Sequence, residues 1–459
     1  MARRVAEAVE AMHGELVSGS GTAEWRGAAI DSRQIAGGEL FFALPGASAD
    51  GHDFAADAVE RGAAAVVVGR PVELPAGGSA IVVGDPYEAL HALTRHVRRQ
   101  TPEHLVALTG SAGKTTTKEL LAAMLARRFR VAKSPGNLNN LLGFPLSLLA
   151  APEDTEWMVA EMGMSTPGEL AEVSRLGRPD VAMILNVGAA HLESFESVRA
   201  IAEAKSEILA GLKIEGLLIW NADDPEVTRI AKRYRERHRV PAVSFGRSPE
   251  AMVRAVGVRP RRPFGSFFEL EAGGSSVTIE LPLHGDFQVD NCLAAAACAH
   301  ALGVPLAAIA EAVADVRPAP MRGEIHVLPG AILIDDSYNS NPEALTRALR
   351  SAAQLPGQRR LAVLGEMLEL GPTGEELHRE AGRVAADCSF TVIAVGELGR
   401  ALADSAAERG AETSWYPDAA AAAEAAAAEV GDYDLVLVKG SRGVGLEVVV
   451  DRLTSSEGG

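Results

Sequence analysis

A strand that breaks into a glycine turn and continues as a helix constrains this chain more than any other feature. Residues 105–109 form the apolar strand, and the turn and helix start that follow contain Gly110, Ser111, Ala112, Gly113, Lys114, Thr115 and Thr116. In such a turn, backbone N–H groups at a helix N-terminus cradle phosphate oxygens, the lysine adds positive charge and a threonine hydroxyl reaches Mg²⁺. Leu108 stands where the longer motif has glycine, so this is the shorter GxxGKT form. The stretch predicts a nucleotide-phosphate site.

The length and charge of the chain limit the kinds of partner that it can bind. Its 459 residues exceed a single hydrophobic core, so we expect two or three domains. The formal net charge of −17 argues against nucleic acid or an anionic membrane surface as a partner. We see no signal peptide and no apolar run of about 18 residues, so we expect no membrane insertion. Cys292, Cys298 and Cys388 lack the spacing of a disulfide framework or a metal site, which favours the cytoplasm.

Short strands alternate with helices in residues 1–98, which predicts a small N-terminal α/β domain. Asp31, Ser32 and Arg33 follow the end of one of these strands. Such a triplet can be a plain turn, or its arginine can contact a phosphate or a uracil edge. The spacing leaves both interpretations open.

The central part, residues 99–316, carries two buried strands that end at polar groups. Glu161 closes the strand at 157–161, and the strand at 181–187 leads towards His191. Ligands of open parallel sheets bind at the carboxyl ends of the strands, so both residues are candidate metal ligands beside the nucleotide phosphates. A histidine after a strand can equally be a structural hydrogen-bonding group.

A lysine lies within the apolar stripe of the helix predicted for residues 196–212. The stripe consists of Val198, Ile201, Ala202, Ile208, Leu209 and Leu212, and Lys205 falls inside it. Its ammonium group could reach water at the edge of the stripe. Alternatively, burial lowers the pKa of the amine, and a neutral amine can take up CO₂ as a carbamate that would act as a carboxylate towards Mg²⁺.

Three further features of the central part remain ambiguous. Asn137, Asn139 and Asn140 lie in one polar loop, which is either a turn or a site for a sugar or an amide. Alternating strands over 255–284 predict an antiparallel layer attached to the parallel sheet. Asn291 precedes a helix predicted for 292–302, where it could contact an adenine edge or cap the helix.

The C-terminal part, residues 317–459, predicts a doubly wound parallel sheet. Its strands are expected at 332–334, 361–364, 391–395 and 435–438, with helices between them. Polar segments follow the strands at 335–342, 365–371 and 439–442. Because such folds bind ligands at strand ends, the candidate substrate-binding residues here are Asn339, Asn341, Lys439, Ser441 and Arg442.

These blocks, in this order, resemble the signatures of the Mur ligase family over nearly the whole chain. The matching blocks are 31–33 with 50–52, then 109–117, 137–140, 161–163, 336–342, 364–371 and 439–442. The last three resemble those of the member that adds D-alanyl-D-alanine.

The resemblance implies three α/β domains. They are a UDP-sugar substrate domain over 1–98, a central ATP-binding domain over 99–316 and a Rossmann-like domain over 317–459. It also implies an ATP-dependent amide ligase that adds D-Ala-D-Ala to UDP-N-acetylmuramoyl-tripeptide through an acyl phosphate. This would be a monomer serving peptidoglycan synthesis, and with it cell shape, cell division and the cell cycle. A sibling Mur or folylpolyglutamate-type ligase is the alternative, and a nucleotide-gated binding protein is a rival of another class.

The resemblance also implies roles for the residues around the phosphates. Lys114 and Thr115 would hold ATP phosphates and the first Mg²⁺. Glu161 and His191 would serve Mg²⁺, and carbamylated Lys205 would support the second ion. Such a metal set argues against a mere nucleotide-gated binding protein.

Other matching positions concern ATP and the UDP-sugar. Arg322 and Asp336 would contact ATP, and Asn291 would lie near the adenine. The UDP-sugar contacts would come from Asp31, Ser32, Arg33, Asn137, Asn139 and Asn140. One block departs from the family, which usually has a His-Asn pair where Phe287 and Gln288 stand, so its adenine pocket does not carry over in detail.

Overall fold

The computed structural model describes residues 3–46, 49–188, 195 and 197–455. The chain forms two compact units, of which the first comprises residues 1–108, 128–183 and 207–218. The second comprises residues 109–127, 184–206 and 219–459. Within the described residues, the strands form three sheets, which confirms the α/β class. The domain limits after residues 98 and 316 stay predictions.

The first sheet belongs to the N-terminal part and has the strand order β1-β5-β4-β3-β2. Its strands are β1 (Glu15–Ser18), β2 (Ala28–Ala29), β3 (Leu40–Phe42), β4 (Ala65–Val68) and β5 (Ala80–Val82), and its helices are α1 (Val5–Ala11), α2 (Ala55–Glu60) and α3 (Pro86–Arg98). β1 pairs antiparallel with β5, whereas the other pairs are parallel. Every second residue of β3 and β4 faces α2, and Phe41 and Val66 are examples that pack with this helix in one apolar cluster. Apolar residues on both faces are typical of parallel strands that are covered on both sides.

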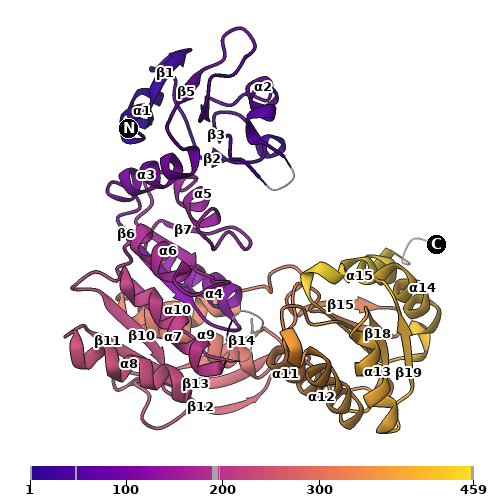
Figure 1. Cartoon of the computed structure of the whole chain (residues 1–459). Coiled ribbons are helices and arrows are strands. Elements are labelled where there is room, and N and C mark those ends of the chain that lie inside the picture. The colour runs from indigo at the N-terminus through magenta and orange to yellow at the C-terminus, as the bar shows by residue number, and fades with distance from the viewer. Residues whose placement is uncertain (1–2, 47–48, 189–194, 196, 456–459) are drawn as a thin grey trace. The chain divides into compact units, whose positions relative to one another are not determined.

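The second sheet has the order β14-β13-β12-β11-β10-β9-β6-β8-β7. Its strands are β6 (His104–Thr109), β7 (Val131–Lys133), β8 (Trp157–Glu161), β9 (Val181–Ile184), β10 (Leu217–Asn221), β11 (Ala242–Gly246), β12 (Val253–Pro260), β13 (Ser266–Ala272) and β14 (Ser275–Leu281). β6, β7 and β8 pair in parallel. β12, β13 and β14 pair antiparallel and run side by side at one edge (Figure 1). The predicted antiparallel strands therefore extend the same sheet.

Helices α4 to α10 follow these strands along the chain. Their bounds are α4 (Lys114–Leu125), α5 (Gly143–Leu149), α6 (Glu169–Gly177), α7 (Val198–Ser206), α8 (Pro225–Arg237), α9 (Phe287–Ala301) and α10 (Leu306–Ala314). The Ala-rich α9 is buried along most of its length and packs against α4, β11 and β12. Among the described residues, none of the helices has the length and apolar character needed to cross a membrane.

The third sheet belongs to the C-terminal part and has the order β15-β16-β20-β17-β18-β19. Its elements are β15 (Glu324–Leu328), β16 (Ala331–Asp335), α11 (Pro342–Ala352), β17 (Arg360–Gly365), α12 (Gly374–Asp387), β18 (Phe390–Val395), α13 (Gly399–Glu408), β19 (Thr413–Tyr416), α14 (Ala419–Glu429), β20 (Leu435–Lys439) and α15 (Glu447–Thr454). All neighbouring strands pair in parallel except β15, which forms a hairpin with β16. The doubly wound sheet is confirmed, whereas β15 and β19 were not predicted.

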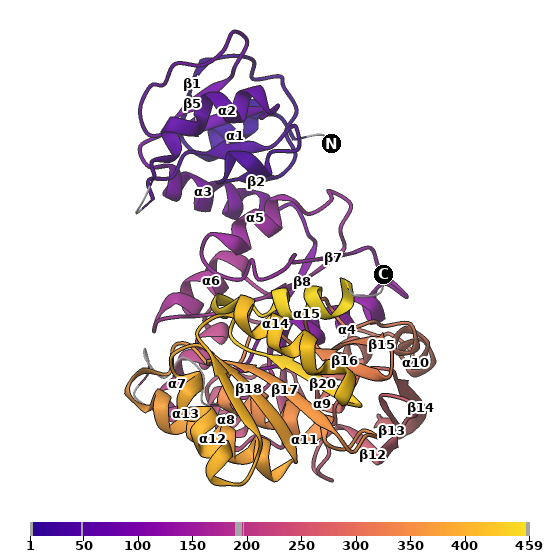
Figure 2. The ribbon, with the colours of Figure 1, turned by 90° about the vertical axis from the view of Figure 1, so that its right-hand side faces the viewer.

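Two apolar clusters lie on opposite faces of this third sheet. Val392 and Leu437 pack with α11, α12 and α13, whereas their chain neighbours Ile393 and Val438 pack with α14 and α15. Figure 2 shows the same division of helices between the two faces. Both faces of the strands are thus apolar, and polar groups are left to the strand ends.

Candidate active site

The glycine turn between β6 and α4 is held in shape by a side chain from another segment. β6 ends at Thr109, α4 begins at Lys114, and Gly113 between them has a positive φ of 79°. The side-chain amide of Asn186 accepts a hydrogen bond from the backbone N–H of Ala112 (2.9 Å) and donates one to its carbonyl oxygen (3.0 Å). The sequence interpretation missed Asn186. The strand predicted over 181–187 ends at Ile184, so Asn186 lies after it rather than within it.

Two side chains of the same turn make hydrogen bonds that hold it closed. Ser111 Oγ donates to the carbonyl oxygen of Gly188 (3.1 Å) and accepts from the N–H of that residue (2.9 Å). Lys114 Nζ donates to the carbonyl oxygen of Gly110 (2.9 Å), and Thr115 is buried in the first turn of α4. The predicted strand, turn and helix are confirmed, and the lysine and threonine lie at the start of α4, as phosphate binding requires.

Asn291 lies against this turn. It is 7% exposed, its Nδ2 donates to Gln288 Oε1 (2.8 Å), and its Oδ1 accepts from Thr117 Oγ1 (3.5 Å). A Cβ at Gly113 would meet Asn291 Oδ1 at 2.1 Å, so only glycine fits there. The suggested cap is wrong, because α9 begins at Phe287 and Asn291 lies inside the helix. Contact of Asn291 with adenine stays a prediction.

Glu161 occupies the predicted position at the carboxyl end of β8. It is 3% exposed and its register partner on β6 is Leu108. Its Oε1 accepts a hydrogen bond from Asn139 Nδ2 (2.9 Å), and its backbone N–H donates to Ser134 Oγ (3.2 Å). A buried, oriented carboxylate suits a Mg²⁺ ligand. His191, the other predicted ligand on a strand end, lies outside the described residues.

The asparagine loop serves as a turn for part of its length. Asn140 Oδ1 accepts hydrogen bonds from the N–H groups of Leu142 (3.1 Å) and Gly143 (2.8 Å), at the start of α5. Asn137 is exposed. The turn interpretation is confirmed for Asn140, and the contact of this loop with a sugar stays a prediction.

Lys205 lies on α7, which ends at Ser206 and continues as a short 3₁₀ helix, Glu207–Ala210. The helix predicted for 196–212 is therefore too long. Lys205 is 3% exposed, so its ammonium group does not reach water. The interpretation that placed it at the edge of the apolar stripe is therefore wrong. Burial, with a smaller contribution from the charge of Lys114, holds the pKa of Lys205 well below its usual range. A neutral amine, the form that takes up CO₂, is thereby favoured.

An ion-pair network anchors the helix that carries Lys205. Glu203 Oε1 pairs with Arg229 (2.9 Å), and Glu203 Oε2 pairs with Arg233 (2.6 Å), both on α8. Hydrogen bonds from Arg233 and then from Arg229 lower the pKa of Glu203 to about 2. This network ties α7, the helix that carries Lys205, to α8.

The N-terminal triplet forms a compact turn. Asp31 caps the 3₁₀ helix Ser32–Gln34 by accepting from the N–H of Arg33 (3.0 Å), and the two side chains pair at 2.7 Å. The Arg33 side chain is 81% exposed. Nearby in sequence, the carboxylate of Asp50 accepts from both the backbone and the ring of His52. The turn is confirmed, and binding of a phosphate or uracil by Arg33 stays a prediction.

In the C-terminal part, Lys439 joins the ends of β16 and β20. Its ammonium group is buried, pairs with Asp336 Oδ2 (2.6 Å) and donates to the carbonyl oxygen of Asn339 (2.9 Å). Asn341 caps α11 by accepting from the N–H of Ala344 (2.8 Å). The structure thus brings together three of the predicted residues, Lys439, Asp336 and Asn339.

Two predicted arginines share one aromatic ring. The guanidinium carbon of Arg322 lies 3.9 Å from the ring centroid of Tyr338, and that of Arg442 lies 6.0 Å from it. Arg442 also pairs with Glu447 (3.2 Å). Stacking keeps the guanidinium planes oriented while leaving their N–H edges suited to phosphate.

A buried histidine missed by the sequence interpretation supports the adjacent loop. His378 Nε2 accepts from the N–H of Met367 (2.8 Å), while its Nδ1 donates to the carbonyl oxygen of Gly374 (2.6 Å). The N–H of Leu368 donates to Ser441 Oγ (2.9 Å), so the predicted Ser441 links the ends of β17 and β20. No local pattern marks His378, because the backbone N–H that it accepts from belongs to Met367, in the loop before its own helix.

Comparison with known proteins assigns the family. Three family models match the chain in order: "Mur ligase family, catalytic domain" over residues 24–112, "Mur ligase middle domain" over 108–299 and "Mur ligase, glutamate ligase domain" over 321–442. A Bacillus subtilis protein named UDP-N-acetylmuramoyl-tripeptide--D-alanyl-D-alanine ligase is 35% identical over 94% of this chain and 93% of its own. The chain belongs to the Mur ligase family.

Solved structures agree with this assignment of the chain to the Mur ligases. A crystal structure of MurF from Acinetobacter baumannii has a TM-score of 0.88 at 30% identity and covers 99% of both chains. The MurF ligase of Thermotoga maritima in complex with ADP has a TM-score of 0.79 at 30% identity, covering 94% of this chain and 97% of its own. The three-domain Mur ligase fold expected from the sequence is thereby confirmed.

Proposed function

We propose that this Mur ligase uses ATP to join D-alanyl-D-alanine to UDP-N-acetylmuramoyl-tripeptide, forming the pentapeptide precursor of peptidoglycan. The observation that carries the proposal is the match over nearly the whole chain to ligases of that name. It is joined by the ordered glycine turn between β6 and α4, which we call the phosphate turn. The products are the amide, ADP and phosphate. This reaction would act in the cytoplasm, which fits three free cysteine thiols, and the protein would act as a monomer.

The reaction follows from the poor reactivity of a carboxylate as an acyl donor. The terminal carboxylate of the tripeptide attacks the γ-phosphorus of ATP, the bond to the ADP oxygen breaks, and an acyl phosphate forms. The amine of D-Ala-D-Ala then attacks the acyl carbon, loses a proton, and expels phosphate. Lys114 and the N–H groups of the turn would hold the transferred phosphoryl group and stabilise its charge.

The chain also provides side chains suited to Mg²⁺, which when bound would neutralise charge on the phosphoryl oxygens. Thr115 would hold one ion through its hydroxyl group. Glu161 is buried and oriented by Asn139, which suits a ligand of either ion. We assign His191 to the same set on the family resemblance. Two ions would then be bound in all.

Lys205 would serve the second ion as a carbamate. Its neutral amine nitrogen would attack CO₂ and lose a proton, which converts the side chain into a carboxylate-like group. The lowered pKa of Lys205 and the ion-pair network around Glu203 support this role. Without modification, a buried amine would offer the ion at most one neutral nitrogen.

The remaining predicted residues would bind the substrates. Arg322 and Asp336 would contact ATP, and Asn291 would lie near its adenine. Contacts with the UDP-tripeptide and the dipeptide are assigned to Asp31, Ser32, Arg33, Asn137, Asn139, Asn140, Asn339, Asn341, Lys439, Ser441 and Arg442. Several of these side chains already share hydrogen bonds, so binding would exchange partners rather than recruit unpaired groups.

The test is phosphate release from Mg-ATP with UDP-N-acetylmuramoyl-tripeptide, in the presence and absence of D-Ala-D-Ala, followed by mass analysis. We expect release that requires both substrates and a product of the pentapeptide mass. Release that requires a different amino acid or acceptor would move the chain to a sibling activity. No release with any of these substrates would overturn ligase activity.

A further inference from the structure

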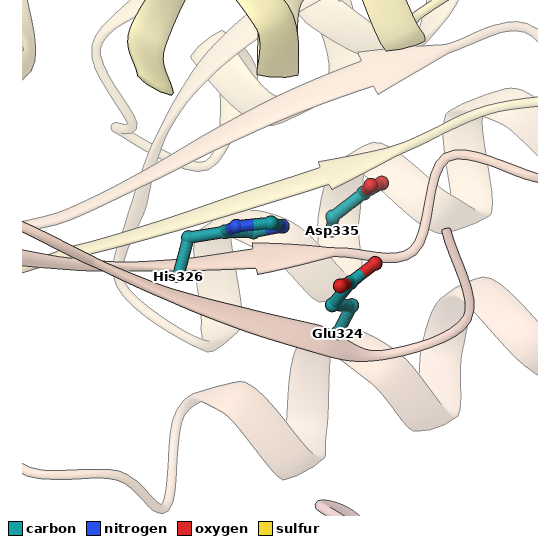
Figure 3. A group of neighbouring side chains, drawn as sticks. All are labelled: Glu324, His326 and Asp335. Carbon is teal, nitrogen blue, oxygen red and sulfur yellow. The ribbon is translucent and has the colours of Figure 1, made fainter. Parts of the chain in front are cut away.

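The β15–β16 hairpin gathers three potential metal ligands on one face. Glu324 and His326 are two residues apart on β15, so they point to the same side, and Asp335 is the register partner of Glu324 on β16. One ligand atom from each residue lies within 4.8 Å of the others. Figure 3 shows the imidazole extending towards the two carboxylates. We call these three residues the hairpin cluster.

One atom of the hairpin cluster lacks a partner that its burial demands. His326 Nε2 is buried, and among the described residues it has no hydrogen-bond partner. Buried polar atoms are normally satisfied, so such an atom calls for a ligand. The second signal is charge, because carboxylates that face each other across two strands repel unless a cation lies between them.

The hairpin cluster also has an orienting contact of the kind found around metal ligands. Ser337 donates to Asp335 Oδ1 through both its backbone N–H (3.0 Å) and its hydroxyl group (2.5 Å). Asp335 is almost fully buried. Ser337 therefore orients this buried carboxylate, as residues around a metal ligand do.

We propose that the hairpin cluster binds a divalent transition-metal ion through one imidazole nitrogen and two carboxylate oxygens. Imidazole beside carboxylates favours Zn²⁺ or a similar ion over Mg²⁺, which prefers oxygen ligands alone. Three protein ligands leave a fourth position for water. Ligand atoms around Zn²⁺ lie about 3.4 Å apart, so the side chains need to move inward by less than ~2 Å. The ion would brace the strand end that leads directly into Asp336.

The test is calorimetric titration of the whole protein with Zn²⁺, after treatment with EDTA and without nucleotide. We expect a Zn²⁺ site in the wild type whose affinity falls about 100-fold or more in His326→Gln. Glu324→Gln should weaken the same site, and it decides the matter if His326→Gln fails to fold. The matched control is His300→Gln, because His300 Nδ1 is also a buried atom that has no partner among the described residues, yet lies outside the hairpin cluster.

Thermal unfolding provides a second readout. Zn²⁺ should raise the melting temperature of the wild type and of His300→Gln, but not that of His326→Gln. Unchanged Zn²⁺ affinity and stoichiometry in both cluster variants would overturn the site. Failure of the wild type to bind Zn²⁺ more tightly than about 0.1 mM would overturn it as well.

Discussion

The phosphate turn and the strand ends of the C-terminal sheet hold their polar groups in different ways. Between β6 and α4, neutral amides fix the backbone, since Asn186 brackets Ala112 and Asn291 packs on Gly113. After β16 and β20, charged groups hold each other, as Lys439 does with Asp336. The amides fix the backbone of the turn before a ligand binds. The two charged groups of the ion pair, in contrast, must give up their contact with each other before either can contact a ligand. Substitutions in the first region should therefore affect nucleotide binding as well as stability, whereas substitutions in the second should affect mainly stability.

The largest effect is expected at the buried lysine near the phosphate turn. Lys205→Ala should reduce turnover about 10³-fold or more, because it removes the group proposed to support the second ion. Nucleotide affinity should stay within about threefold, since Lys114 and the turn are untouched. Phosphate release and a nucleotide-binding titration measure the two quantities. Activity like that of the wild type would rule out the carbamate role.

The C-terminal pair should respond mainly in stability. Lys439→Met leaves the carboxylate of Asp336 without its buried partner, so the free energy of unfolding should fall by about 2–4 kcal/mol in urea titrations. The double variant Lys439→Met with Asp336→Asn should regain part of this loss, because no unpaired charge remains. A single variant as stable as the wild type would remove the contrast between the two regions.

Loss of the amide support of the phosphate turn should affect both stability and nucleotide binding. Asn291→Ala removes the contact with Gly113 and leaves Gln288 without its partner, at a cost of about 1–2 kcal/mol in stability. We expect ATP affinity to fall by about tenfold, because the turn loses its fixed shape. The control is Asn221→Ala at the end of β10, which removes a side-chain amide that donates to the carbonyl oxygen of Leu185. An equal loss of affinity in both variants would contradict a specific role for Asn291.

The smallest effect is expected for the guanidinium stacked on Tyr338. Arg322→Lys keeps the charge but loses the planar stack, which is worth about 0.5–1 kcal/mol. The KM for ATP should rise about two- to fivefold with kcat nearly unchanged. Steady-state kinetics with varied ATP measure this, and Arg400→Lys, which removes a similar contact with Trp415, is the matched control.

The sequence predicted those parts of the site that depend on neighbouring residues. The strand, turn and helix around Lys114 follow from one continuous pattern, and the strand that ends at Glu161 follows from a buried apolar run. The family resemblance supplied the importance of Lys205, because periodicity alone left its burial undecided. The parallel strands of the C-terminal part were predictable for the same reason, because each is a continuous apolar run.

The supporting residues were not predictable, because their partners lie far away in the sequence. Asn186 bonds to a turn 74 residues earlier, and no local pattern marks such a contact. The start of α9 was misplaced because residues 285–291 resemble a loop, although the helix already begins at Phe287. The helix of Lys205 was drawn too long because its apolar stripe continues through the 3₁₀ turn.

The bracket that Asn186 places on the phosphate turn has a consequence for timing. A loop that must change conformation around its ligand adds a slow step after each encounter. Many encounter complexes dissociate before this step is complete. Here both hydrogen bonds of the bracket are made within the protein itself. The capture of a triphosphate should accordingly be limited by how often it meets the protein in the right orientation, and the observed rate should rise in proportion to ATP concentration without a plateau.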